Sequence, residues 1–157
     1  MSSLIARQPV ELTSDIADHL DALMRLDVAT GGIVRGVANP LIVPTTEVTR
    51  NGHWSNVRTG IYLPCTAART VRYVGSVHRT APAIAARLRE HFTEHPEREA
   101  TWTHMALITL PTTITLAALR RCEGRAGRAL DPLDNTRLPA VPGRPAWIPR
   151  PGCGLTS

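Results

Sequence analysis

Apolar residues recur at every third or fourth position in three stretches, residues 14–28, 83–95 and about 114–129. This spacing places one apolar stripe along a helix, so it predicts three amphipathic helices. Ser14 is a candidate N-cap for the first helix. Pro96 ends the second helix, because the residue before a proline is disfavoured in helical conformation.

Three shorter stretches, residues 60–63, 71–75 and 104–110, have the composition of β-strands, and the polar run 66–70 suits a hairpin between the first two. Residues 33–58 contain only short β-like runs broken by prolines, and the pattern gives them no place in a fold. The order strand, strand, helix, strand, helix predicts an α/β (α+β) fold. We expect a small three-stranded antiparallel sheet flanked by helices, with an N-terminal helical extension.

The pattern divides the chain into three parts. Residues 1–58 form an extension with one amphipathic helix, residues 59–136 form a compact domain, and residues 137–157 form a tail. The tail is rich in proline and has no periodicity, which is typical of an extended or disordered arm. The extension has three open roles: it completes the fold, supports dimerisation or contacts DNA.

The charge balance and the cysteines narrow the class of protein. The formal net charge is +5, and every basic side chain is Arg. Guanidinium groups match phosphate geometry, although codon bias towards Arg is the favoured explanation of an Arg-only set. The basic excess lies after residue 58, which favours a polyanionic partner only weakly. Three widely spaced cysteines and the absence of a long apolar N-terminal run favour a reducing cytoplasm, with no signal peptide or membrane span.

The chain has 2 tyrosines, and both lie in short motifs on neighbouring predicted strands. The motifs are Gly60-Ile61-Tyr62 and Tyr73-Val74-Gly75. A named tripeptide arises by chance on the order of once in ten thousand positions, so a pair at hairpin distance makes coincidence a poor explanation. At these residues the sequence resembles the GIY-YIG nuclease family.

The resemblance continues beyond the second motif. The family has an Arg on the following helix, often with a His one turn later, and this chain has Arg87 and His91 there. The family then has a Glu on a later helix and an Asn further along, which correspond to Glu123 and Asn135. The segment before Arg87 is longer than the family's compact form, so Arg89 is an alternative to Arg87.

The resemblance implies metal-dependent hydrolysis of phosphodiester bonds in DNA, by an endonuclease that uses one Mg²⁺ or another divalent cation such as Mn²⁺. Tyr62 would act as general base or orient the attacking water, and Tyr73 would hold water or phosphate by its hydroxyl. Arg87 would stabilise the developing negative charge. Glu123 would bind the metal ion, and Asn135 would brace the site or bind substrate.

The residue pattern supports Glu123 independently. Leu116, Leu119 and Leu130 define an apolar face of the last helix, and a 100° step per residue places Glu123 near its middle. A carboxylate there is costly unless it meets a cation or strong donors. Either a divalent metal ion or a buried Arg such as Arg87 would meet that need.

Three other features leave alternatives open. Gly127 lies on the same helix face and costs the helix roughly 1 kcal/mol relative to Ala, which predicts a close approach of the sheet or of substrate. His91 lies nearly within its apolar stripe, and a core histidine suits it as well as a catalytic one. Arg121, Arg125 and Arg128 lie opposite Glu123, either solvated or against a DNA backbone.

Two functions from different classes fit these observations. The first is an active endonuclease. The second is a catalytically inactive module that keeps the fold and binds nucleic acid or another partner.

Overall fold

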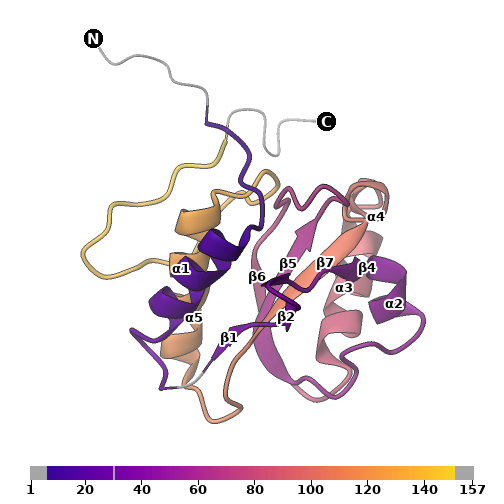
Figure 1. Ribbon diagram of the computed structural model, residues 1–157, viewed down its shortest axis with the longest axis horizontal. Coiled ribbons are helices and arrows are strands. Elements are labelled where there is room, and N and C mark those ends of the chain that lie inside the picture. The colour runs from indigo at the N-terminus through magenta and orange to yellow at the C-terminus, as the bar shows by residue number, and fades with distance from the viewer. Residues whose placement is uncertain (1–6, 30, 151–157) are drawn as a thin grey trace.

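The computed structural model describes residues 7–29 and 31–150, and it has three layers (Figure 1). An antiparallel sheet lies between two groups of helices, so the expected mixed α/β fold with an antiparallel sheet is confirmed. One face is covered by α1 (Ser14–Met24) and α5 (Leu116–Leu130), and the other by α2 (Thr45–Thr49), α3 (Ala83–Glu94) and α4 (Glu97–Thr101). None of the described helices is long and apolar enough to cross a lipid bilayer.

The centre of the sheet is β5 (Thr59–Cys65), which pairs antiparallel with β6 (Gly75–His78) and with β7 (His104–Thr109). All the residues of β5 are buried, because strands cover both its edges and helices cover both its faces. Tyr62 lies directly opposite Gly75 in the β5–β6 pairing. The register therefore brings the two motifs side by side.

Short strands from the N-terminal part of the chain extend the sheet beyond β7. They are β1 (Gly32–Ile33) and β4 (Val43–Pro44), and a separate hairpin is formed by β2 (Arg35–Gly36) and β3 (Asn39–Pro40). Among the described residues the sheet thus has 5 strands, not the three expected. Of the roles left open for this segment, it completes the fold. Strands of two residues are too short to show alternation, which is why the pattern missed them.

Successive side chains of β5 point to opposite faces of the sheet, so they belong to two separate core clusters. Ile61 and Leu63 belong to the cluster under α1 and α5, with Leu119. Tyr62 points to the opposite face and belongs to the cluster under α3, with Leu88. The side chain of Tyr62, the first motif tyrosine, therefore lies on the α3 side of the sheet.

Two local expectations were wrong. The N-cap of α1 is Thr13 and not Ser14, because the Thr13 hydroxyl oxygen accepts the N–H of Ile16 at 3.2 Å. The strand expected over residues 71–75 begins only at Gly75. Before that point the backbone meets β5 at an isolated bridge at Val71 and through the N–H groups of Arg72 and Tyr73, which donate to the Pro64 carbonyl at 2.8 and 3.4 Å. It then follows other partners described below.

The end of α1 is joined to α5 through a buried carboxylate. Asp27, whose side chain is 7% exposed, accepts Nε–H bonds from Arg121 at 2.7 Å and from Arg125 at 2.9 Å. Burial raises the pKa of Asp27, but the two guanidiniums outweigh it and hold the pKa below the usual value. The expectation of solvated arginines was therefore wrong here. Arg128 instead donates to the Pro139 carbonyl at 2.9 Å.

The tail lies against α5, and two glycines make room for it. A Cβ on Gly124 would lie 2.5 Å from the Pro139 carbonyl oxygen. A Cβ on Gly127 would lie 2.4 Å from the Leu138 side chain. The close approach at Gly127 is thus made by the tail, and not by the sheet or a substrate as expected.

Residues 137–150 have no helix or strand, yet their far end is anchored. The Arg150 guanidinium is buried and donates to the carbonyl oxygens of Asp131 at 2.8 Å and of Arg7 at 2.6 Å. The Trp147 ring N–H donates to the Asp131 carboxylate at 3.0 Å. The described part of the tail is therefore extended and packed.

Asp27→Asn is expected to lower the free energy of unfolding at neutral pH by about 1–3 kcal/mol, because it removes the charge that two guanidiniums share. The folded-state pKa of Asp27 is lowered. Its contribution is therefore present above the pKa of the unfolded chain and is lost as pH falls through the folded value. Denaturant unfolding should therefore show a smaller difference in the free energy of unfolding between the wild type and Asp27→Asn in acid than at pH 7.

The matched control is Asp15→Asn, an exposed position in the first turn of α1, which should change stability less. A deficit for Asp27→Asn that is equally large at both pH values would contradict this assignment.

Candidate active site

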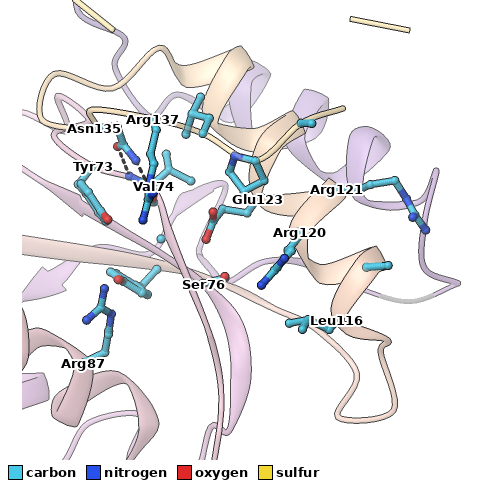
Figure 2. A pocket seen from close by; sticks show the side chains of 16 residues that line it. Tyr73, Val74, Ser76, Arg87, Leu116, Arg120, Arg121, Glu123, Asn135 and Arg137 are labelled. Atoms are coloured by element: carbon cyan, nitrogen blue, oxygen red, sulfur yellow. Dashed lines mark hydrogen bonds between the residues drawn. The ribbon is translucent and has the colours of Figure 1, made fainter. Parts of the chain in front are cut away.

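A cavity of about 810 Å³ opens beside β6. The residues expected from the sequence that line it are Tyr62, Tyr73, Arg87, Glu123 and Asn135. In Figure 2, Arg87 lies on one side of the cavity, and Glu123 lies across from it on α5. Side chains from separate parts of the chain thus face one space. Val74 and Gly75 of the second motif also line it, whereas His91 and the first-motif residues Gly60 and Ile61 do not.

The edge position of β6 allows this convergence. It is the last strand of the sheet on its side, and it has only 4 residues. Both α3, from one face of the sheet, and α5, from the other, contact it. Side chains from the two helical layers therefore meet around the strand edge without a sheet between them.

The motif glycines are required by packing. A Cβ on Gly75 would lie 2.3 Å from both Cζ and the hydroxyl oxygen of Tyr62. A Cβ on Gly60 would lie 2.6 Å from the carbonyl oxygen of Ile108 on β7. The glycine of the second motif thus makes room for the tyrosine of the first, and the glycine of the first motif lets β5 approach β7.

Asn135 holds the second motif by its backbone. Its side-chain oxygen accepts the Val74 N–H at 2.9 Å, and its side-chain NH₂ donates to the Val74 carbonyl at 2.9 Å. The preceding residue, Asp134, donates its backbone N–H to the Arg72 carbonyl at 2.7 Å. Together with the bond from the Arg72 N–H to the Pro64 carbonyl on β5, these bonds fix the backbone on both sides of Tyr73, where a regular strand was expected.

Arg87 and Arg89 point in different directions from α3. Arg87 lines the cavity, and its Nη1 is 2.9 Å from a carboxylate oxygen of Glu90. Arg79 and then Arg87 lower the pKa of Glu90 to about 2. Arg89 is exposed and donates to the Thr49 carbonyl on α2. Of the two alternatives, Arg87 is the one at the site.

Glu123 lies at the edge of the buried face of α5 and not in its middle. Leu116, expected on that face, is 56% exposed. The buried apolar side chains of α5 are Ala118, Leu119, Cys122, Ala126 and Leu130. Burial raises the pKa of Glu123, while hydrogen bonds from Ser76 and the charges of Arg120 and Arg87 act in the opposite direction. In Figure 2 the carboxylate points into the cavity toward Ser76.

The surroundings of Glu123 fit a divalent cation. None of the salt bridges found among the described residues includes Glu123, and its hydrogen bonds come from Ser76. Nor do three or more His, Cys, Asp or Glu side chains of that part of the chain form a ligand cluster. Magnesium is commonly held by one or two carboxylates, with water and substrate phosphate oxygens completing its shell. A lone carboxylate in an open cavity meets that description.

Both tyrosines are neutral phenols at neutral pH. Tyr62 is 1% exposed, and burial raises its pKa well above the usual value, although the charge of Arg87 acts against this. Burial likewise raises the pKa of Tyr73. The two rings are nearly parallel, with centroids 6.1 Å apart. Their hydroxyls can therefore donate to or accept from a bound group, but ionisation requires additional positive charge.

His91 lies behind the cavity and is 2% exposed. Its Nε2 is 2.8 Å from the Tyr62 hydroxyl, and its Nδ1 is 2.8 Å from Nη1 of Arg98. The Trp102 ring packs against it at a centroid distance of 5.0 Å. Burial, together with the charges of Arg87 and Arg98, lowers the pKa of His91 to about 3. It is a hydrogen-bonded core histidine in direct contact with the first motif.

The cavity has further polar residues that the sequence did not single out. Ser76 follows the second motif directly, and Arg137 begins the tail. Arg120 precedes Glu123 by one helical turn, and in Figure 2 it points to the same cavity. Of these three residues, only Arg120 could have been found from the sequence, because residues three apart on a helix lie on the same side as each other and Arg120 is three residues before Glu123.

Comparisons with protein-family models, with curated proteins and with solved structures gave no match. The functional assignment of this chain therefore depends on the geometry and chemistry of the cavity.

The contact between Gly75 and Tyr62 can be tested by a double-mutant cycle. Gly75→Ala is expected to lower the free energy of unfolding by about 1–3 kcal/mol, because the new methyl overlaps the phenol ring. In a Tyr62→Leu background the same change should cost much less, since the phenol is gone. Denaturant unfolding of the four proteins measures the coupling. Additive effects would contradict the contact.

Proposed function

We propose that this protein is a metal-dependent endonuclease of the GIY-YIG type, which hydrolyses phosphodiester bonds in DNA. One observation carries the proposal: Tyr62, Tyr73, Arg87 and Glu123 line a single cavity whose wall is braced by Asn135. These residue types supply a water-orienting hydroxyl, a cation for phosphate and a hard oxygen ligand, which phosphodiester hydrolysis requires together.

In this proposal the guanidiniums around the cavity bind phosphate. Arg87 approaches from α3, while Arg120 on α5 and Arg137 on the tail line other parts of the cavity. Arg forms paired hydrogen bonds with phosphate oxygens and keeps its charge at all relevant pH values. A scissile phosphate bound there would face cations from both helical layers, so charge that develops on its oxygens is neutralised in place.

The tyrosines position the attacking water. Since burial raises the pKa of Tyr62, its hydroxyl orients water as a neutral phenol and acts as a base only when positive charge comes close. Tyr73, the more exposed of the two, holds water or a phosphate oxygen by its hydroxyl. Asn135 keeps Tyr73 in place through the Val74 backbone.

Glu123 would hold the divalent cation, Mg²⁺ or Mn²⁺. When bound, the cation would neutralise negative charge at the leaving oxygen. Ser76 and Arg120 flank the carboxylate and favour its ionised form, which is the form that binds a cation.

The proposal is tested by a nicking assay with Mg²⁺ or Mn²⁺ on supercoiled, branched and single-stranded DNA. The wild-type protein should cleave at least one of these forms. Glu123→Gln should reduce the rate by at least about a hundredfold, because it removes the anionic ligand but keeps the shape. Glu94→Gln, an exposed position on α3, is the matched control and should cleave as the wild type does.

Equal cleavage by wild type and Glu123→Gln would reject the metal role. DNA binding that persists in chelator, with no cleavage of any substrate form, would instead favour the catalytically inactive module.

The phosphate contacts make a separate prediction about affinity. Arg120→Gln is expected to weaken DNA binding and to reduce the slope of log affinity against log salt by about one. Fluorescence anisotropy over a NaCl series, with chelator present to prevent cleavage, measures both. Arg50→Gln, an exposed Arg beside α2 that does not line the cavity, is the control of equal charge. Identical slopes for the two variants would contradict a phosphate contact at Arg120.

A further inference from the structure

His91 links the first motif tyrosine to an arginine outside the cavity. Its Nε2 is 2.8 Å from the Tyr62 hydroxyl oxygen, and its Nδ1 is 2.8 Å from Nη1 of Arg98. The ring is buried and both of its nitrogens are occupied. The direction of each hydrogen bond therefore determines how Tyr62 can use its own proton.

The Arg98 contact decides these directions. A guanidinium has N–H donors and no acceptor, so Nδ1 of His91 must accept with its lone pair. A neutral imidazole has one N–H, which must then be on Nε2. A doubly protonated ring would bring two donors face to face, and the lowering of the His91 pKa to about 3 agrees with a neutral ring. The Nε2–H group thus donates to the Tyr62 oxygen.

Arg98 is itself held firmly. Its guanidinium lies over the Trp102 ring at 4.8 Å from the centroid and over the Tyr73 ring at 5.2 Å. The indole N–H of Trp102 donates to the Asp134 carboxylate at 2.7 Å. Such stacking fixes a side chain that otherwise has many rotamers. The donor that faces His91 is consequently well placed.

We propose that Arg98 is a positioning residue, which fixes His91 as the Nε2–H tautomer and thereby makes the Tyr62 oxygen a hydrogen-bond acceptor. This inference rests on the proposed nuclease function. It leaves the hydroxyl proton of Tyr62 directed away from His91 and available to a group in the cavity. It also assigns Arg98 a part in the site although α4 contributes no residue to the cavity wall.

The tautomer sets the route of the Tyr62 proton. His91 cannot take that proton, because the one lone pair of its ring is on Nδ1 and is used by Arg98. When the O–H bond of Tyr62 breaks, the proton must pass to water on the cavity side. The phenolate that remains keeps the His91 N–H as a donor. His91 is therefore a donor that stabilises the phenolate, and not a relay base.

The tautomer is measured by ¹⁵N NMR of the imidazole nitrogens, with the His91 signals assigned by their loss in His91→Gln. In the wild type, Nδ1 should have the shift of an unprotonated nitrogen and Nε2 that of a protonated one. Arg98→Met keeps the aliphatic stem without the donor, and its His91 should become a mixture of tautomers. Arg98→Lys keeps a donor and should retain the wild-type pattern.

Cleavage kinetics give the second readout. Arg98→Met should lower kcat by roughly two- to tenfold, in proportion to the fraction of His91 that leaves the Nε2–H form, with little change in KM for DNA. Arg98→Lys should recover much of that loss. An unchanged kcat in Arg98→Met would overturn the positioning role.

The two readouts separate the inference from the function on which it rests. A wild-type His91 with its proton on Nδ1 overturns the tautomer assignment whether or not the protein cleaves DNA. A wild type that cleaves no DNA overturns the proposed nuclease.

Discussion

The central strand β5 is buried along its whole length, and this burial fixes the position of the side chains around it. A strand paired on both edges and covered on both faces has no freedom of register, because a slip by one residue would reverse every side chain. Tyr62 is consequently fixed on the α3 face, opposite Gly75. The absence of a Cβ at Gly75 lets the phenol lie over β6, and His91 holds its hydroxyl from behind. The rest of the site is arranged around this side chain.

The second half of the site comes from the other layer, and its position depends on contacts far from the cavity. Glu123 is placed by α5, which is joined to the end of α1 through Asp27 and covered by the tail at Gly124. Asn135 then ties the chain after α5 to the second motif. The N-terminal part and the tail thus serve as supports of the cavity, although neither resembles a nuclease motif.

Sequence reasoning found residues whose types and spacing carry information, and it missed those defined by tertiary contact. Tyr62 and Glu123 were identified because a rare motif and a carboxylate near an apolar helix face can be recognised from the sequence alone. Helical periodicity placed Leu116 on the buried face, but its side chain is 56% exposed and lines the cavity. The strands β1 and β4 were too short for any period. The contact of Arg98 with His91 depends on the turn between α3 and α4, which no spacing rule encodes.

Under the proposed function, Glu123 and the surrounding side chains form a site for one divalent cation beside the tyrosines. Titration of ¹⁵N-labelled protein with Mn²⁺ detects such a site, because the ion broadens amide signals near the position where it binds. Substoichiometric Mn²⁺ should broaden the signals of Ser76 and of the residues around Glu123 first, and Glu123→Gln should abolish this effect. Broadening that is centred elsewhere, or that is unchanged in Glu123→Gln, would contradict a cation site at Glu123.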